Sequence, residues 1–230
     1  MSRFMNLQGI YPFNIYAAFI SPNPLTSFAP YSYYPRIHSS SFVGPFSSII
    51  GAVTIDENVF IAPNVSIRAD EGYPFYIGKN TNLQDGVILH GLKDERVKVQ
   101  NKLYSIFIGN GVSCAHGSTI HGPCYIEDNC FIGFNSIVFN AHLKEGVYVS
   151  SNSVVTNGVT IPKNSFVPPG ASIDSQEKAN ALKPVPPDKE AFAQEVKRVN
   201  EEFPPSYSLL LGLRRCSCGL ACDEIRKPLP

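Results

Sequence analysis

The sequence lacks an excess of charge of either sign. Its 19 Lys and Arg residues balance 19 Asp and Glu residues, and charged residues make up only 17% of the chain. Without a strongly basic surface there is no electrostatic reason to expect binding to nucleic acid or to an anionic membrane. The sequence also lacks any apolar run of the roughly 20 residues that a membrane-spanning helix needs. We therefore expect no nucleic-acid partner and no membrane association.

A convincing export signal is missing as well. The aromatic segment 10–20 is interrupted by Pro12 and Asn14, and only Arg3 supplies positive charge ahead of it. No clear small-x-small cleavage site follows this segment. We therefore expect a cytoplasmic protein.

What the sequence does contain is an aliphatic residue, or once a cysteine, at every sixth position, interrupted by a short insertion after Ile67, a longer one after Leu89 and a slip of one residue after Val138. These positions are Ile37, Val43, Ile49, Ile55, Ile61, Ile67, Ile77, Leu83, Leu89, Ile108, Cys114, Ile120, Ile126, Ile132, Val138, Leu143, Val149, Val155, Ile161, Val167 and Ile173. A period of six fits neither the 3.6-residue period of a helix nor the alternation of a simple strand. It is typical of an all-β solenoid, the parallel β-helix, in which three hexapeptides close one triangular coil.

The period divides the chain into four parts. Residues 1–36 are rich in Pro, Tyr and Phe, and we expect them to drape along the β-helix or cap its first coil. The β-helix itself occupies 37–174, and residues 175–203 are expected to form a C-terminal helical region that packs on it. There, Asp188 is the expected N-cap of a helix from Lys189 to Phe203, which Pro204 and Pro205 would end. Residues 204–230 form a Cys-containing tail.

The six cysteines fall into two groups. Cys114, Cys124 and Cys130 occupy inward repeat positions, so we expect them to be small core residues. The other three lie in segment 216–222 as a C-x-C-x3-C run, which lacks the two C-x2-C pairs of a convincing structural zinc site. That cluster could bind a metal, form a disulfide or carry exposed thiols.

Three histidines stand out within the repeat. His90 and His121 each follow an inward aliphatic residue, whereas His116 follows an inward position by two residues. His116 and His121 therefore belong to consecutive hexapeptides on adjacent faces, and one chain cannot readily aim both at one point. Two subunits packed side by side in a closed ring of three could do so. Three imidazoles with an open fourth position are typical of catalytic zinc, although all three could instead be ordinary surface histidines.

The segments 68–72, 82–90 and 116–123 resemble γ-class carbonic anhydrases, both the archaeal members and the N-terminal domain of carboxysomal scaffold proteins. The resemblance extends over about 37–200. It implies a left-handed coil, a homotrimer, and reversible hydration of carbon dioxide to bicarbonate and a proton by a metal-bound hydroxide at the subunit interface. It also implies that the ligands of Zn²⁺, or of Fe²⁺ or Co²⁺, come from two subunits. The residues that match these ligands are His90, His116 and His121.

The same resemblance implies roles for several other residues. Gln84 is expected to orient the metal-bound hydroxide, with Asn82 close by on the same strand, and Glu71 to accept or relay the proton. Asn200 is expected to reach back to the substrate pocket from the C-terminal helix, and Phe139 to line it.

An ion-pair cluster at the subunit interface is implied as well. In the family an arginine and an aspartate tie the subunits together beside the metal, and Arg68 and Asp85 match them, with Asp70 in the same cluster. This network could serve catalysis or only stabilise the trimer.

The sequence departs from the archaeal pattern at Lys93, which replaces a proton-shuttle glutamate and leaves Asp94 or Glu95 as substitutes. A γ-like metal-binding protein without appreciable hydratase activity, a hexapeptide-repeat acyltransferase and a structural interaction module therefore stay open as alternatives. In carboxysomal relatives a cysteine pair with the spacing of Cys216 and Cys222 forms an activating disulfide. Those relatives also append Rubisco small-subunit-like repeats, which this sequence lacks up to Pro230, so we do not expect a Rubisco-organising role.

Overall fold

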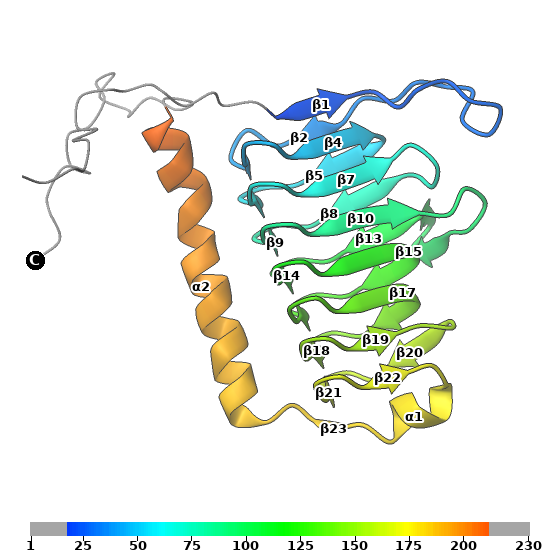
Figure 1. The fold of residues 1–230 in the computed structure, drawn as a ribbon, viewed down its shortest axis with the longest axis vertical. Helices are drawn as coiled ribbons and strands as arrows, with labels where there is room; N and C mark the ends of the chain where they lie inside the picture. Colours follow the sequence, from blue (N-terminus) through cyan, green and yellow to red (C-terminus); the bar gives the residue numbers. More distant parts are fainter. Residues whose placement is uncertain (1–17, 212–230) are drawn as a thin grey trace, which may run out of the picture.

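The protein is built around a parallel β-helix whose coils stack from β1 at one end to β22 at the other (Figure 1). The computed structural model describes residues 18–211. Three columns of short strands form the three faces of this β-helix, and each strand pairs in parallel with the equivalent strand of the next coil. The predicted solenoid is thus confirmed.

The first face contains β1 (Phe19–Ser21), β4 (Ser48–Gly51), β7 (Ser66–Ala69), β10 (Ile88–Gly91), the first halves of β15 (Thr119–Ile126) and β17 (Ile137–Leu143), β19 (Val154–Val155) and β22 (Ser172–Ile173). The second face contains β2 (Arg36–Ile37), β5 (Val53–Ile55), β8 (Phe75–Ile77), β13 (Ile106–Ile108), the second halves of β15 and β17, and β20 (Val159–Ile161).

The third face contains β3 (Phe42–Val43), β6 (Phe60–Ile61), β9 (Asn82–Leu83), β14 (Ser113–Cys114), β16 (Phe131–Ile132), β18 (Tyr148–Val149), β21 (Ser165–Val167) and the antiparallel β23 (Lys183–Pro184). A hairpin of β11 (Val97–Val99) and β12 (Lys102–Tyr104) projects from the coil between β10 and β13. Helix α1 (Gln176–Asn180) follows β22, and helix α2 (Pro187–Leu210) follows β23.

The core is the column of inward side chains that the six-residue period predicts. Ile49, Ile67, Leu89 and Ile120 stack along the first face with no exposed surface. The three inward cysteines are buried and free, as expected from their repeat positions. Burial disfavours the charged thiolate and raises the pKa of Cys124 and of Cys130 to about 12.

The N-terminal end of the β-helix is closed by the segment that precedes the repeat. β1 pairs with β4 and so adds a strand to the first coil, and Asn23 fixes the following loop. The side chain of Asn23 donates to the carbonyl of Tyr31 and accepts from the amide of Tyr33, at 3.0 Å and 2.8 Å. The described part of residues 1–36 therefore caps the solenoid.

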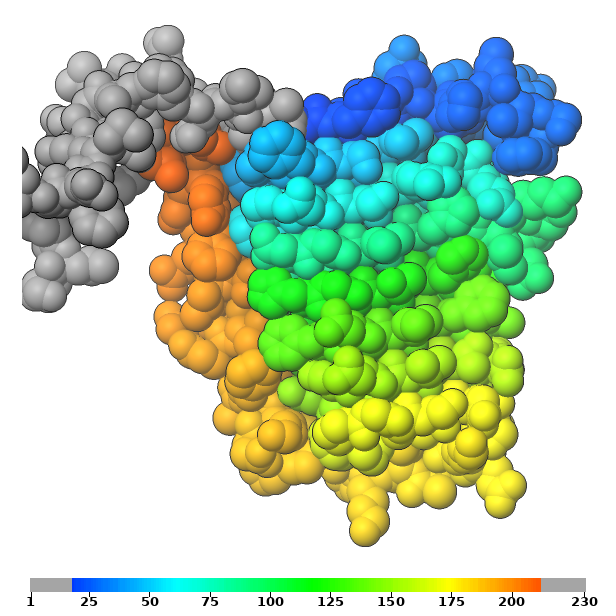
Figure 2. All heavy atoms as spheres, in the orientation of Figure 1, coloured from blue at the N-terminus to red at the C-terminus, as the bar shows by residue number. Residues whose placement is uncertain are grey.

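Helix α2 runs back along the third face and packs against it (Figure 2). Phe203 and Tyr207 contact Phe60, with ring centroids 5.0 Å and 5.8 Å apart, and Phe192 contacts Phe131 at 5.7 Å. Within residues 18–211, no helix combines the length and the apolar character needed to cross a membrane.

The predicted limits of this helix were wrong at both ends. It begins at Pro187 after the N-cap residue Pro186, so Asp188 lies in the first turn, and it continues past Phe203 to Leu210. Pro205 has no amide hydrogen to donate to the carbonyl of Glu201, four residues earlier. The side chain of Asn58 donates to that carbonyl instead, at 3.2 Å. This substitute partner from the β-helix helps the helix to continue through the prolines.

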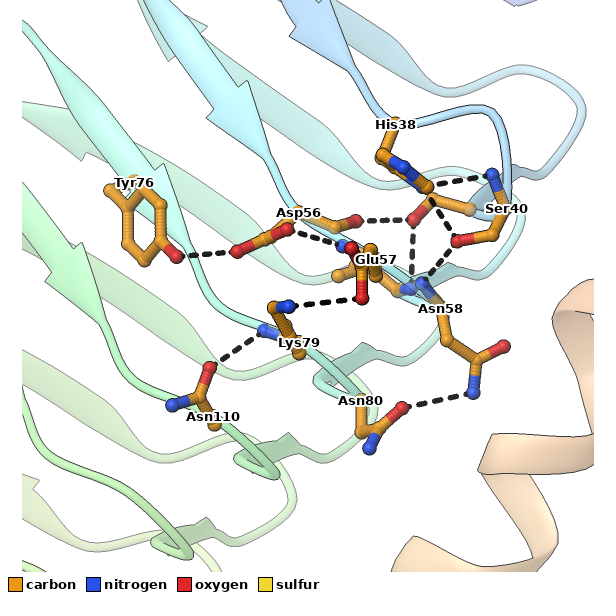
Figure 3. Close-up of polar contacts among 11 residues, drawn as sticks. His38, Ser40, Asp56, Glu57, Asn58, Tyr76, Lys79, Asn80 and Asn110 are labelled. Atoms are coloured by element: carbon orange, nitrogen blue, oxygen red, sulfur yellow. Dashed lines mark hydrogen bonds and ion pairs between the residues drawn. The ribbon is translucent and has the colours of Figure 1, made fainter.

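Asn58 lies at a corner of the β-helix, where the chain turns with a positive φ angle (Figure 3). Asn58 and Asn80 have φ angles of 52° and 55°, which Asn tolerates better than most residues. The two side chains also bond to each other, since Asn58 donates to Asn80 at 3.0 Å. The Asn residues between repeat positions are thus both turn formers and links between coils.

Candidate metal centre

His90 and His121 lie side by side on the first face of the β-helix. They are register partners on the paired strands β10 and β15, so both side chains project outward from adjacent coils. Nδ1 of His90 lies 3.2 Å from Nε2 of His121, and the ring centroids are 5.1 Å apart. This separation allows one ion to contact both rings.

Three charged residues lie beside His90. Nε2 of His90 lies 3.4 Å from Oδ1 of Asp70 and 3.8 Å from Oε2 of Glu71. Arg68, the register partner of His90 on β7, donates from Nε to Oδ2 of Asp70 at 3.1 Å. Burial, together with the positive charge of Arg68, lowers the pKa of His90 despite the two carboxylates. A lowered pKa keeps the imidazole neutral, which is the form that binds a metal.

Phe139 closes the pair on the side of the next coil. It is the register partner of His121 on β17, and the two rings meet edge to face with centroids 5.2 Å apart. The resemblance to γ-class carbonic anhydrases implied a pocket-lining aromatic at this position, and the structure places Phe139 against His121.

His116 lies apart from this pair, in the turn between β14 and β15. It precedes the first-face half of β15, whereas His121 ends that half. Oδ2 of Asp85 lies 3.0 Å from Nδ1 of His116, and the ring of Phe134 stacks on the imidazole with an interplanar angle of 6°. Both contacts hold the imidazole so that Nε2 is left for another partner.

A polar gap interrupts the aromatic surface under α2 close to His116. Phe42 and Phe60 precede this gap on the third face, and Phe131 follows it. At the gap, Asn82 donates from Nδ2 to Oγ of Ser113 at 2.8 Å.

Gln84 extends this polar chain toward His116. It donates from Nε2 to Oδ1 of Asn82 at 3.1 Å, and both side chains are buried. The hydrogen-bonded chain thus sets the direction of the Gln84 amide.

A pocket of about 420 Å³ lies between this gap and α2. Gln84, Asp85, His116 and Phe134 line it from the β-helix, and Asn200 lines it from the helix. Asn200 is buried, and its side chain donates to the carbonyl of Val196 at 2.8 Å, which leaves its Oδ1 free to accept. The helix thus brings Asn200 into the same pocket as His116.

A single chain therefore carries two incomplete halves of the predicted site. One half contains His90, His121 and Glu71, and the other contains His116 and Gln84. Within the part of one chain that the structure describes, no three His, Cys, Asp or Glu residues are placed to hold a metal together. The residues fit a metal only if His116 comes from a second chain. The ion pair expected between Arg68 and Asp85 would also join two chains, so one chain does not test it.

Arg96 anchors the loop that carries Lys93. Arg96 donates from Nη1 to the carbonyl of Leu92 at 3.1 Å, and its guanidinium carbon lies 5.3 Å from the ring centroid of Tyr73. Lys93 pairs with Asp94 at 3.5 Å, with both side chains more than half exposed. The position expected for a shuttle thus carries a solvated cation.

Two features of this region were missed in the sequence. Phe134 lies one coil beyond His116, and the insertion that ends at Ser105 passes behind His90 and His121. Register between coils could have suggested Phe134, which follows His116 by 18 residues, the length of one regular coil. No signal in the sequence pointed to Ser105.

Comparison with known proteins identifies the fold and the family. Two hexapeptide families match parts of the chain: the bacterial transferase hexapeptide (six repeats) at 34–69 and the hexapeptide repeat of succinyl-transferase at 123–163. A carbonic anhydrase from Methanosarcina thermophila is 38% identical over 179 residues, which cover 74% of this chain and 72% of the relative. The chain belongs to the family of γ-class carbonic anhydrases. Its parallel β-helix is accordingly left-handed, as the resemblance implied.

A second relative of this chain is longer than the carbonic anhydrase. The carboxysome assembly protein CcmM of Nostoc sp. is 45% identical over 192 residues, which cover 83% of this chain. The matched part spans about a third of that relative's length, at 34%. Among solved structures, a Bacillus cereus protein of suggested acetyltransferase activity aligns with a TM-score of 0.66 and 25% identity, covering 84% of this chain and 98% of that one. This likeness shows the fold.

Proposed function

We propose that the protein catalyses the reversible hydration of carbon dioxide to bicarbonate and a proton, at metal centres shared between the subunits of a homotrimer. The observation that carries this proposal is the division of the ligands. His90 and His121 lie together on one edge of the first face, and His116 lies before the other edge. A ring of three chains would bring each pair against the His116 of a neighbour.

The chemistry of the donors supports a catalytic metal such as Zn²⁺, with Fe²⁺ or Co²⁺ as alternatives. Carbonic anhydrases are the standard example of a bound metal that lowers the pKa of a water ligand and so supplies a nucleophile near neutral pH. Three imidazoles suit these ions and leave one position open.

Gln84 and Asn82 would orient the reacting water. Gln84 donates from Nε2 to Asn82, and Asn82 donates from Nδ2 to Ser113. The carbonyl Oε1 of Gln84 is therefore left to accept a hydrogen bond. An acceptor in this fixed direction holds a water proton away from the attacking lone pair. Asn200 lines the same pocket and can contact the substrate or product.

Glu71 would receive the proton that hydration releases. Its carboxylate lies 3.8 Å from His90, and the side chain is 36% exposed, so it borders both the ligand pair and solvent. A carboxylate at this boundary can accept a proton and pass it to buffer. Arg68 and Asp70 hold each other beside it and fix the edge of the site.

The experiment that tests this proposal is stopped-flow carbon dioxide hydration on protein with quantified metal, compared with His116→Ala. We expect hydration by the wild type and its loss, together with metal, in the variant. His142→Ala is the matched control, because His142 pairs with Glu127 at 2.7 Å on the second face. Full metal occupancy without hydration would contradict the proposal.

A second candidate is a γ-carbonic-anhydrase-like metal-binding protein without appreciable hydratase activity. Lys93 favours it, because a solvated ammonium replaces the shuttle glutamate of the archaeal enzymes. Metal-loaded but inactive wild-type protein is the result that would select this alternative. A hexapeptide-repeat acyltransferase would instead turn over an acyl donor without any bound metal.

A further inference from the structure

Three glycines converge on the side chain of Ser105. A β-carbon at Gly72 would lie 2.6 Å from Oγ of Ser105, and one at Gly122 would lie 2.7 Å from it. A β-carbon at Gly91 would collide with the same oxygen and would lie 3.2 Å from Cβ of Ser105. None of these three glycines has a positive φ angle. They are required for space, which the Ser105 hydroxyl shares with backbone atoms: a β-carbon at Gly72 would also lie 2.5 Å from the carbonyl oxygen of Leu92, and one at Gly122 would collide with the carbonyl oxygen of Ser105.

Each of these glycines directly follows a residue of the candidate metal centre. The three residues that precede them are Glu71, His90 and His121. They come from three different stretches of chain, namely the turn after β7 and the strands β10 and β15. Ser105 is therefore one peptide unit away from every residue that this chain contributes to the ligand-pair half of the site.

Ser105 is itself held firmly. It has no exposed surface, and it lies between the hairpin and β13. Its amide donates to the carbonyl of Pro74 at 2.9 Å, and its own carbonyl accepts from the amide of Cys124 at 2.9 Å. The backbone of Ser105 is thus fixed to the coils on both sides.

The hydroxyl of Ser105 makes no hydrogen bond within residues 18–211. A buried hydroxyl without a partner is destabilising by about 1–3 kcal/mol, so an alanine here would be the more stable choice if only packing mattered. The oxygen instead fills the volume between three glycine backbones.

We propose that Ser105 is a positioning residue that sets the spacing of His90, His121 and Glu71. This inference rests on the proposed function, because it assumes that these residues serve one metal centre. A larger side chain at 105 would push the glycine backbones apart, and a smaller one would let them close. Either change would move imidazoles that must be held to within about 0.5 Å for tight metal binding.

The test compares Ser105→Val and Ser105→Ala with Ser150→Val and Ser150→Ala. Ser150 is the matched control, since it is also buried with a hydroxyl that lacks a partner, but it lies after β18 on the third face. Co²⁺ affinity is measured by metal competition with the visible spectrum of the bound ion, on variants with the oligomeric state of the wild type. We expect Ser105→Val to weaken Co²⁺ binding by at least about tenfold, Ser105→Ala by a few-fold, and the Ser150 variants not at all.

Two results would overturn the inference. One is a folded Ser105→Val protein that binds Co²⁺ as tightly as the wild type, and the other is an equal loss in Ser150→Val. If Ser105→Val does not fold, Ser105→Ala decides, and wild-type affinity in that variant rejects the role. Failure of the proposed function is distinct, because it appears as wild-type protein that binds no Co²⁺ or that binds it without hydrating carbon dioxide.

Discussion

The carboxylate of Asp85 lies 3.0 Å from Nδ1 of His116, although the resemblance to γ-class carbonic anhydrases assigns Asp85 to an ion pair with Arg68 of a neighbouring subunit. A carboxylate has two oxygens and can serve both partners. The contact within the chain gives Asp85 a role before any assembly, because a carboxylate at this distance from Nδ1 favours the tautomer that leaves the lone pair of Nε2 free.

Asp85→Asn should therefore weaken metal binding without disturbing the fold. We expect Co²⁺ affinity to fall by about 10-fold to 100-fold, because an uncharged amide holds the His116 imidazole less firmly than the carboxylate does. Glu127→Gln is the matched control, since it alters a carboxylate 2.7 Å from the imidazole of His142 on another face. Equal effects of the two substitutions on Co²⁺ affinity would show that Asp85 has no special role.

A site shared between subunits also predicts complementation. His116→Ala and His121→Ala remove ligands from opposite halves, so each homotrimer should lack hydration activity. After mixed subunits are unfolded and reassembled, an interface is complete when it pairs an intact His116 with an intact His121. We expect equal mixtures to recover about a quarter of wild-type activity. Separate assembly followed by mixing is the control, and absence of recovery would place all ligands within one chain.

Much of the fold could be predicted because the six-residue period states directly which side chains point inward. The end of α2 could not, since it depends on a contact distant in sequence. Pro205 looks like a helix terminator on its own, and only the approach of Asn58 supplies a donor to the carbonyl of Glu201. Local propensity was overridden by packing between the helix and the β-helix.

The candidate site divides in the same way. The repeat alone predicted that His116 and His121 lie on different faces, because each hexapeptide forms one face and the two residues belong to consecutive hexapeptides. The repeat did not predict the position of Ser105, because this residue lies in an insertion where the six-residue period is interrupted. The role of that residue depends on three glycines that are brought together only by the stacking of coils.

The pH dependence of stability should include a contribution from Asp56, which lies at a corner next to the second face (Figure 3). Burial opposes ionisation, but hydrogen bonds from the Tyr76 hydroxyl at 2.7 Å and the Glu57 amide at 2.8 Å, together with attraction to Lys79, outweigh it. The pKa of Asp56 is therefore below its ordinary value of 3.8.

A lowered folded-state pKa means that the ionised carboxylate stabilises the protein at neutral pH. This contribution is present above about pH 4 and is lost as the pH falls through the folded-state pKa. We expect Asp56→Asn to lower the urea midpoint at pH 7 and to lower it less at pH 3. Tyr76→Phe should shrink the effect of Asp56→Asn at pH 7, and additive effects of the two substitutions would contradict the coupling.

The last prediction concerns the proton path at Lys93. If hydration is limited by proton release, Lys93→Glu should raise the turnover number in dilute buffer by about tenfold, because a carboxylate beside the site can accept and release the proton. The anchored loop, with Arg96 donating to the carbonyl of Leu92, should accommodate the change. Lys98→Glu on the neighbouring hairpin strand β11 is the control for added negative charge. In concentrated imidazole buffer, external base replaces the shuttle and the difference should vanish. A gain that persists there, or that Lys98→Glu reproduces, would show that the substitution acts through the electrostatic field of the site and not through proton transfer.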